Sequence, residues 1–162
     1  MEGITAFCHY QVMAKPEKYR FSNKQSVAWG DMDAYGHLNN VIYARYFETA
    51  RALYFTNAGL WEDPSRVGQG APVLIRLEID FRRQVVFPAT LDVTIDLDSV
   101  NSRGFGMPCS MWQDEDCVAT AYASFVWFDF KKGRPERMPE NLLQSLREKQ
   151  MPGVKKTRAE NP

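Results

Sequence analysis

The sequence predicts an α+β protein in which one long buried helix is wrapped by a five-stranded antiparallel sheet. Three observations carry this prediction: an apolar helical period over residues 40–59, strictly alternating segments after it, and short turn signals between those segments. A helix that is apolar over most of its circumference is a buried one, and strands with one dry face need a layer to cover them. With 162 residues, the chain is long enough for a single core.

The expected elements follow in chain order. The stretch "NKQSVAWG", residues 23–30, is expected to form the first strand. The helix begins near Asn40, with Asn39 or Asn40 as its N-cap, and Gly59 can end it. Period-two alternation and turn signals then predict four strands, at residues 73–82, 91–98, 104–112 and 117–130.

Two features of the last strands suggest where they lie in the sheet. Pro108 cannot donate to a strand ladder, which predicts an edge position or a bulge. The segment 117–130 is the least polar, and its alternating alanines form a smooth face, which favours a central position. A short helix is expected to begin near Pro139.

We expect one folded domain, residues 23–131, between an N-terminal extension, residues 1–22, and a C-terminal short helix with a basic tail, residues 132–162. Acidic and basic residues balance at 20 each, so no global field favours nucleic acid or an anionic membrane as a partner. No segment reaches the ~20 apolar residues of a membrane span. Three cysteines without a close pair argue against a disulfide framework or a zinc site and favour the cytoplasm.

A polar turn, "GDMDAYGHLNN", directly precedes the long helix. The first turn of a helix presents unpaired N–H groups and the positive end of a macrodipole of about half a charge. Such a terminus can hold an oxyanion, and a carboxylate such as Asp33 beside it can act as base or nucleophile. Capping and turn chemistry explains the same residues, with Gly36 allowing a positive φ. A metal site on Asp31, Asp33 and His37 would have too few oxygen ligands.

At this point the sequence resembles a known family. The stretches "DMDAYGHLNNVIYARYFETAR" and "LIRLEIDFRRQVVFPATLDV" resemble the 4-hydroxybenzoyl-CoA thioesterase-like branch of hot-dog-fold acyl thioesterases. The first stretch also resembles the D-x-D-x-x-x-H-x-N-N-x-x-Y segment of plant-type acyl-carrier-protein thioesterases. The resemblance covers residues 24–130. It implies the hot-dog fold, a homodimer or homotetramer with sites at the subunit interface, and hydrolysis of an acyl-CoA or acyl-carrier-protein thioester without a metal or redox cofactor.

The resemblance also implies roles for single residues. Asp33 matches the catalytic aspartate of the family, His37 matches the histidine of the plant-type motif, and Asn40 falls where a helix-start amide polarises the thioester carbonyl. Two departures leave the division of labour between Asp33 and His37 open. Tyr35 stands where the plant-type motif has a catalytic asparagine, and Asn40 stands where some bacterial relatives have a histidine.

Substrate binding is expected to involve residues outside the turn. Tyr43 is the aromatic residue of the motif, and Glu78 loosely matches an assisting glutamate of plant-type relatives. Arg82 and Arg103, with Arg83, could meet the phosphates of coenzyme A. Core packing and ordinary surface exposure are the alternatives. Glu48, three residues from both Arg45 and Arg51, fits an ion-paired helix edge.

Residue spacing disfavours one other branch of the same fold. Hydratases and dehydratases use G-D-x-N-P-x-H, in which aspartate and histidine stand five apart. Here Asp31 precedes His37 by six positions and Asp33 precedes it by four, with no Asn-Pro between. Two functions therefore remain: an acyl-CoA thioesterase, or a non-catalytic hot-dog protein that binds an acyl or CoA ligand or serves as an assembly subunit.

Overall fold

The computed structural model describes residues 15, 20–58 and 70–149. Its elements are β1 (Phe21–Ser26), the 3-10 turn η1 (Trp29–Asp31), α1 (Asn40–Asn57), β2 (Ala71–Phe81), β3 (Thr90–Ile95), β4 (Asp98–Asn101), β5 (Gly104–Gln113), β6 (Asp116–Asp129), β7 (Arg134–Pro135) and α2 (Glu140–Lys149). All strand pairs are antiparallel, in the order β1-β3-β5-β6-β2. The short strands β4 and β7 pair with β5 and β6.

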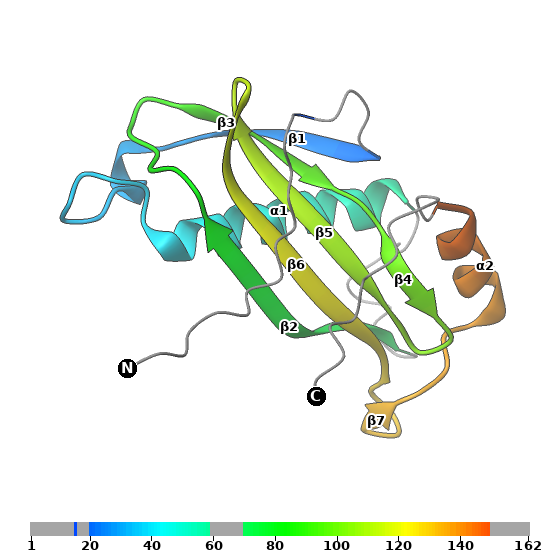
Figure 1. Ribbon diagram of the computed structural model, residues 1–162. Helices are drawn as coiled ribbons and strands as arrows, with labels where there is room; N and C mark the ends of the chain where they lie inside the picture. The colour runs from blue at the N-terminus through cyan, green and yellow to red at the C-terminus, as the bar shows by residue number, and fades with distance from the viewer. Residues whose placement is uncertain (1–14, 16–19, 59–69, 150–162) are drawn as a thin grey trace, which may run out of the picture.

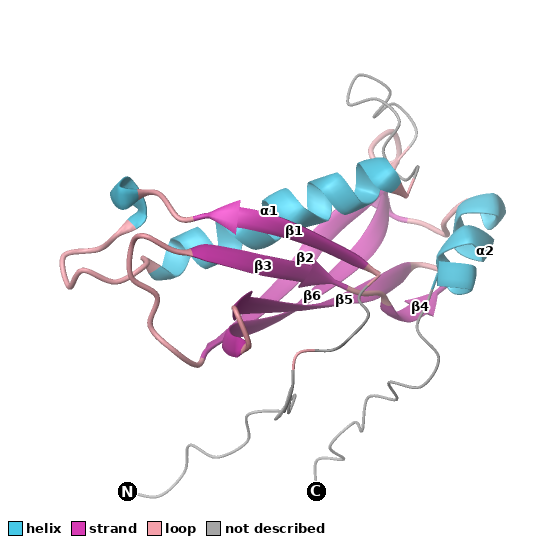
Figure 2. Cartoon of the chain, turned by 90° about the horizontal axis from the view of Figure 1, so that it is seen from above, coloured by secondary structure: helices cyan, strands magenta, loops and turns pink. Residues whose placement is uncertain are grey.

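The sheet curls around α1, which runs across one of its faces (Figures 1 and 2). This arrangement confirms the predicted fold class, and the main path contains the expected first strand and the four strands expected from alternation and turn signals. β6 lies between β5 and β2, as its apolar alanine face suggested. α2 begins one residue after Pro139 and packs beside β4.

The helix α1 owes its position to its apolar side chains and its cap. Asn39 has extended dihedral angles, and its side-chain oxygen accepts a hydrogen bond from the N–H of Val41, so Asn39 rather than Asn40 is the N-cap. Ala58 caps the other end, and Gly59 lies outside the described residues. The side chains that α1 buries are those of Tyr43, Tyr46, Phe47, Ala50, Tyr54 and Phe55.

The register of the sheet fixes which strand residues meet α1. Val93 pairs with Met111, Met111 with Ala119, and Ala119 with Phe81, so these four side chains share one face. The ring of Phe81 packs edge-on against Tyr43 of α1, with ring centroids 5.1 Å apart. This face therefore holds the core, and the neighbouring residues of each strand point to the other face.

The first strand differs from its expected range. β1 begins at Phe21 and ends at Ser26, whereas the sequence predicted residues 23–30. The N–H groups of Asp31 and Met32 bond back to the carbonyls of Ala28 and Trp29, which closes the η1 turn. The Asp31 carboxylate also accepts the N–H of Ala28, and such a local side-chain bond competes with strand pairing.

Of the two situations expected for Pro108, an edge position or a bulge, the edge position is wrong. Pro108 is buried within β5, between β3 and β6. Its carbonyl accepts the N–H of Asp96, which lies at the break between β3 and β4. The ring nitrogen of Pro108, which has no N–H to donate, faces the same break. The register is the same on both sides of this break, since Ile95 faces Cys109 and Asp98 faces Gly106. A proline is thus tolerated in an interior strand because the neighbouring ladder is interrupted opposite to it.

Candidate active site

The polar segment before α1 forms a closed turn at one end of the molecule (Figure 1). Met32 and Leu38 pair as an isolated antiparallel bridge. Inside it, the N–H of Asp33 donates to the carbonyl of His37 at 2.8 Å, and the N–H of Gly36 donates to the carbonyl of Asp33 at 3.0 Å. Gly36 has a φ of 75°, which explains the glycine at this position. We refer to residues 32–38 as the mouth loop.

The carboxylate of Asp33 uses one of its two oxygens to hold this loop. Oδ1 accepts the N–H groups of Tyr35 and His37, at 2.8 and 3.2 Å. Oδ2 has no hydrogen-bond partner among the residues that the structure describes. Since Asp33 is half-buried, Oδ2 is accessible while its position is fixed through Oδ1. Asp33 can therefore both hold the turn through Oδ1 and react through Oδ2.

The first turn of α1 presents one N–H without a partner. Asn39 accepts the N–H of Val41 through its side chain and the N–H of Ile42 through its carbonyl, at 3.2 and 2.9 Å. Within the described part of the chain, the N–H of Asn40 makes no hydrogen bond. It lies at the positive end of the α1 dipole, where a developing oxyanion is stabilised.

Asp31, by contrast, is fully engaged. Its side chain is buried, with Oδ1 paired to the guanidinium of Arg45 and Oδ2 accepting the hydroxyl of Tyr46 at 2.6 Å and the N–H of Ala28 at 3.1 Å. The Tyr46 hydroxyl is the main reason that the pKa of Asp31 lies below its usual value. Burial and Asp31 together raise the pKa of Tyr46 to about 12. Asp31 is therefore unsuited to accept a proton from substrate water.

The other predicted site residues fall into two groups. His37 is a half-buried member of the mouth loop, and exposed Tyr35 stands beside it. Tyr43 lies one turn into α1, buried against Phe81, and burial raises the pKa of its phenol. Leu38 donates its N–H to the carbonyl of Val85 at 2.8 Å, which ties the mouth loop to the segment after β2.

The segment after β2 carries two of the predicted arginines. Arg82 Nε donates to the hydroxyl of Thr120 at 3.3 Å, and Arg83 is paired with Asp116. Both side chains are exposed close to the end of β2. The structure thus brings the His37, Tyr43 and Arg82 positions to the same end of the molecule as Asp33 and Asn40. The Arg82 side chain, however, bonds to Thr120 on the sheet face away from α1.

Glu78 and Arg103 are not brought to this end within one chain. Glu78 pairs with Arg76 and projects from the sheet face opposite to that of Phe81 and Tyr43. The carbonyl of Arg103 accepts the N–H of Trp127, whereas the mouth end of β6 is at Val118. These positions on β6 are about 30 Å of strand apart, and the β4–β5 turn lies at the end of the molecule away from the mouth loop (Figure 1). Exposed Glu48 pairs with the largely buried Arg51, one of the two arginines that its spacing suggested, and the other, Arg45, pairs with Asp31.

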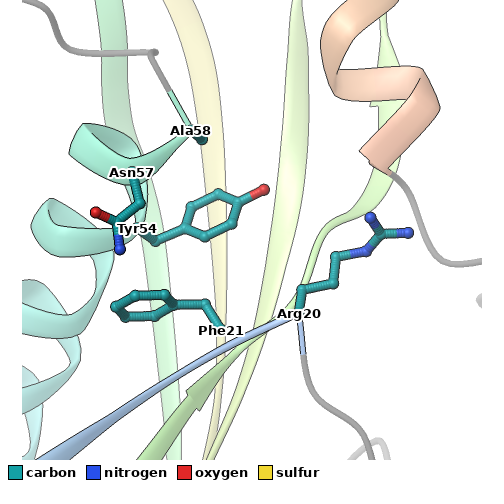
Figure 3. A pocket seen from close by; sticks show the side chains of 5 residues that line it. All are labelled: Arg20, Phe21, Tyr54, Asn57 and Ala58. Atoms are coloured by element: carbon teal, nitrogen blue, oxygen red, sulfur yellow. The ribbon is translucent and has the colours of Figure 1, made fainter.

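A separate pocket of about 320 Å³ lies at the C-terminal end of α1 (Figure 3). It is lined by Arg20, Phe21, Tyr54, Asn57 and Ala58. The ring of Phe21 packs edge-on against Tyr54, and burial raises the pKa of the Tyr54 phenol to about 12. This pocket is at the opposite end of α1 from Asn40 and takes no part in the mouth geometry.

Sequence reasoning missed the partners of Asp31. Arg45 and Tyr46 follow it by 14 and 15 residues, and no local pattern indicates that the second turn of α1 folds back onto that carboxylate. No group of three or more His, Cys, Asp or Glu side chains within the described ranges could hold a metal ion. No described helix has the length and apolar character needed to cross a membrane.

Comparisons with known proteins identify relatives of this chain. The chain is 25% identical to the long-chain acyl-CoA thioesterase FadM of Escherichia coli over 119 residues, which cover 71% of this chain and 88% of FadM. It is 31% identical over 84 residues to the uncharacterized protein YsmA of Bacillus subtilis, covering 52% of this chain and 55% of YsmA. The match thus spans little more than half of YsmA.

Solved structures show the same fold. A thioesterase of Thermus thermophilus complexed with coenzyme A and Zn superposes with a TM-score of 0.71 at 24% identity, covering 82% of this chain and 96% of that one. A 1,4-dihydroxy-2-naphthoyl-CoA thioesterase of Synechocystis gives a TM-score of 0.70 at 17% identity, covering 78% and 94%. Residues 27–146 match the model of the thioesterase-like superfamily. This range includes the mouth loop, α1 and the strands that follow. The chain therefore belongs to the thioesterase-like superfamily.

Proposed function

We propose that the protein is an acyl-CoA thioesterase in which Asp33 acts on a thioester carbonyl held at the start of α1. The observation that carries the proposal is that Asp33 belongs to the closed loop that leads into the first turn of α1, where the Asn40 N–H lies. One carboxylate oxygen of Asp33 is fixed by two backbone donors. Among the described residues, neither its other oxygen nor the Asn40 N–H of the first helical turn has a hydrogen-bond partner. The similarity to FadM, a long-chain acyl-CoA thioesterase, supports the substrate class.

The chemistry follows from these two groups. The thioester carbonyl oxygen accepts the N–H of Asn40, which draws electron density from the carbonyl carbon. Asp33 either takes a proton from a water that attacks this carbon, or attacks the carbon itself to form an anhydride that water then opens. Collapse of the tetrahedral intermediate breaks the carbon–sulfur bond. The thiolate leaves and takes up the proton, giving a free acid and a thiol.

His37 and Tyr43 have supporting roles in this proposal. His37 lies on the same loop as Asp33, where its imidazole can orient the attacking water or protonate the departing thiolate. Tyr43 and Phe81 form an aromatic wall beside the mouth, suited to the acyl group. Arg82 offers a charge for the phosphates of coenzyme A. Glu78 and Arg103 would reach this site only from a second copy of the chain.

A second copy is part of the proposal. β2 is the last strand on the sheet path, 11 residues long, and it exposes Leu74, Ile75 and Phe81. A long apolar edge strand is a template for pairing with another strand. We therefore propose a homodimer that pairs β2 with β2. Light scattering should give twice the chain mass for the parent and the monomer mass for Ile75→Lys, and a monomeric parent would reject the dimer.

The function is tested by incubating the protein with a panel of short, long and aromatic acyl-CoAs and one acyl carrier protein, and measuring free thiol. We expect turnover of at least one thioester. The alternative, a non-catalytic protein that binds an acyl or CoA ligand, predicts ligand binding by calorimetry without thiol release from any member of the panel.

Cys109 and Cys117 are free thiols, which favours a reducing compartment, and we place the activity in the cytoplasm.

A further inference from the structure

The mouth loop is closed on itself, and few contacts fix it relative to α1. Its internal bonds join Asp33 to Tyr35, Gly36 and His37, and Met32 to Leu38. These bonds set the shape of the loop but not its orientation relative to the Asn40 N–H. That orientation depends on the bond from the Leu38 N–H to the Val85 carbonyl and on the two ends of the loop, where the chain leaves η1 and enters α1.

Asp31 is the residue that joins those two ends. Its carbonyl accepts the N–H of the N-cap residue Asn39 at 2.9 Å, across the base of the loop. Its carboxylate accepts the N–H of Ala28 from the η1 side and the hydroxyl of Tyr46 from the second turn of α1. Four residues therefore bond to one buried aspartate: Ala28, Asn39, Arg45 and Tyr46. We call Asp31, Ala28, Arg45 and Tyr46 the Asp31 network.

The contacts of the network differ in how much they can constrain the loop. The Arg45 side chain is 57% exposed, so its pairing with Asp31 is screened and contributes little. Tyr46 is only 2% exposed, and its hydroxyl lies 2.6 Å from Asp31 Oδ2 in a buried position. A short bond from a packed phenol to a buried carboxylate has little freedom, so Tyr46 fixes Asp31 more firmly than Arg45 does.

We propose that Asp31 is a positioning residue of the thioesterase site: through Tyr46 and the Asn39 N–H it holds the mouth loop so that Asp33 faces the Asn40 amide. The expected effect on kcat rests on the proposed function, because only a protein that hydrolyses thioesters has a kcat to lower. Asp31 itself does not touch the substrate. Its contribution is to orientation, and small displacements of a reacting group can lower a rate roughly a hundred-fold.

The simpler alternative is that the Asp31 network only stabilises the fold. A buried hydrogen-bonded network elsewhere in the chain provides the matched comparison. Ser110 is buried, and its hydroxyl lies 2.7 Å from that of Thr94 and accepts the indole N–H of Trp112 at 2.7 Å. Thr94 and Ser110 face each other on the side of the sheet away from α1. Ser110→Ala should therefore lower the Tm without touching the mouth loop.

The test compares Tyr46→Phe and Asp31→Ala with Ser110→Ala and the parent, at a temperature at which circular dichroism shows all of them folded. Steady-state kinetics on an acyl-CoA substrate should give a kcat about ten-fold lower for Tyr46→Phe and lower still for Asp31→Ala, with KM within about two-fold. Amide hydrogen exchange should be at least ten-fold faster at Tyr35 and His37, whose N–H groups mark the Asp33 geometry. Ser110→Ala should leave kcat and these two amides unchanged.

Two results would overturn the proposal. Tyr46→Phe and Asp31→Ala with the parental kcat and parental exchange at Tyr35 and His37 would mean that the mouth loop holds itself. The same losses in Ser110→Ala would mean that they report general destabilisation. A parent that hydrolyses nothing would reject the proposed function. The exchange measurement needs no turnover, so it would still decide whether Asp31 holds the loop. Asp31→Ala being unfolded would leave the decision to Tyr46→Phe, which removes a single oxygen.

Discussion

Asn39 connects the stability of α1 to the proposed chemistry at its first turn. Its side-chain oxygen accepts the Val41 N–H at 3.2 Å, and the next residue carries the amide proposed to bind the oxyanion. Replacing an asparagine N-cap by alanine typically costs about 1 kcal/mol. For a domain of this size, that change lowers the Tm by about 2–4 °C. Asn39→Ser keeps a neutral acceptor and should stay within about 0.5 kcal/mol of the parent.

Asn39→Asp separates stability from catalysis. Aspartate caps as well as asparagine and favours the positive end of the helix dipole, so the free energy of unfolding should be unchanged or higher. Its carboxylate, however, would stand beside the oxyanion. Two unit charges about 4 Å apart repel by about 4 kcal/mol at an effective dielectric constant of about 20. Only part of a charge develops in a half-exposed site, so we expect a loss of about 1.4 kcal/mol, or ten-fold in kcat.

The assay pairs chemical denaturation with acyl-CoA hydrolysis for the parent and the Ala, Ser and Asp variants of Asn39. The reasoning would be refuted by Asn39→Asp at full activity, since no oxyanion would then form at this helix start. An Asn39→Ala variant as stable as the parent would refute the cap.

Two other predictions concern stability. A Cβ on Gly104 would lie 2.2 Å from the carbonyl oxygen of Phe125 in the β5–β6 ladder, so Gly104→Ala should lose about 1–3 kcal/mol in urea denaturation. Gly30→Ala, which meets nothing within 4 Å, is its control, and equal losses in both would contradict the close approach. Burial raises the pKa of Asp96, so the fold favours the protonated carboxyl over the carboxylate. Protonated Asp96 stabilises the fold at low pH, and this contribution is lost as the pH rises through the folded pKa. Asp96→Asn should therefore raise the Tm at pH 7 more than at pH 3, and a gain that grows on acidification would reverse this sign.

The helix and the main strands could be predicted because their determinants are local. The apolar period of α1, the cap at Asn39 and the alternation along β2 and β3 all act within a few residues. The end of β1 and the place of Pro108 could not be predicted in this way. One depends on the Asp31 side chain bonding to Ala28, and the other on a ladder break in the neighbouring strand.

The candidate site divides along the same line. Asp33, His37 and Asn40 lie within eight positions of one another, so a single turn brings them together and the sequence could single them out. Arg45 and Tyr46 reach Asp31 only through the packing of α1. Glu78 and Arg103 were grouped with Asp33 by type and motif. Within one chain, the strand register places Glu78 and Arg103 away from Asp33. No local sequence pattern indicates that register.

The central claim is that the Asp33 carboxylate performs the hydrolysis, and Asp33→Asn tests it most directly. Asparagine keeps an oxygen that can accept the Tyr35 and His37 N–H groups, so the loop is retained while charge and basicity are lost. For Asp33→Asn we expect kcat for free-thiol release from the best acyl-CoA substrate to fall at least a hundred-fold, with an unchanged Tm. Turnover by Asp33→Asn at the parental rate would contradict it.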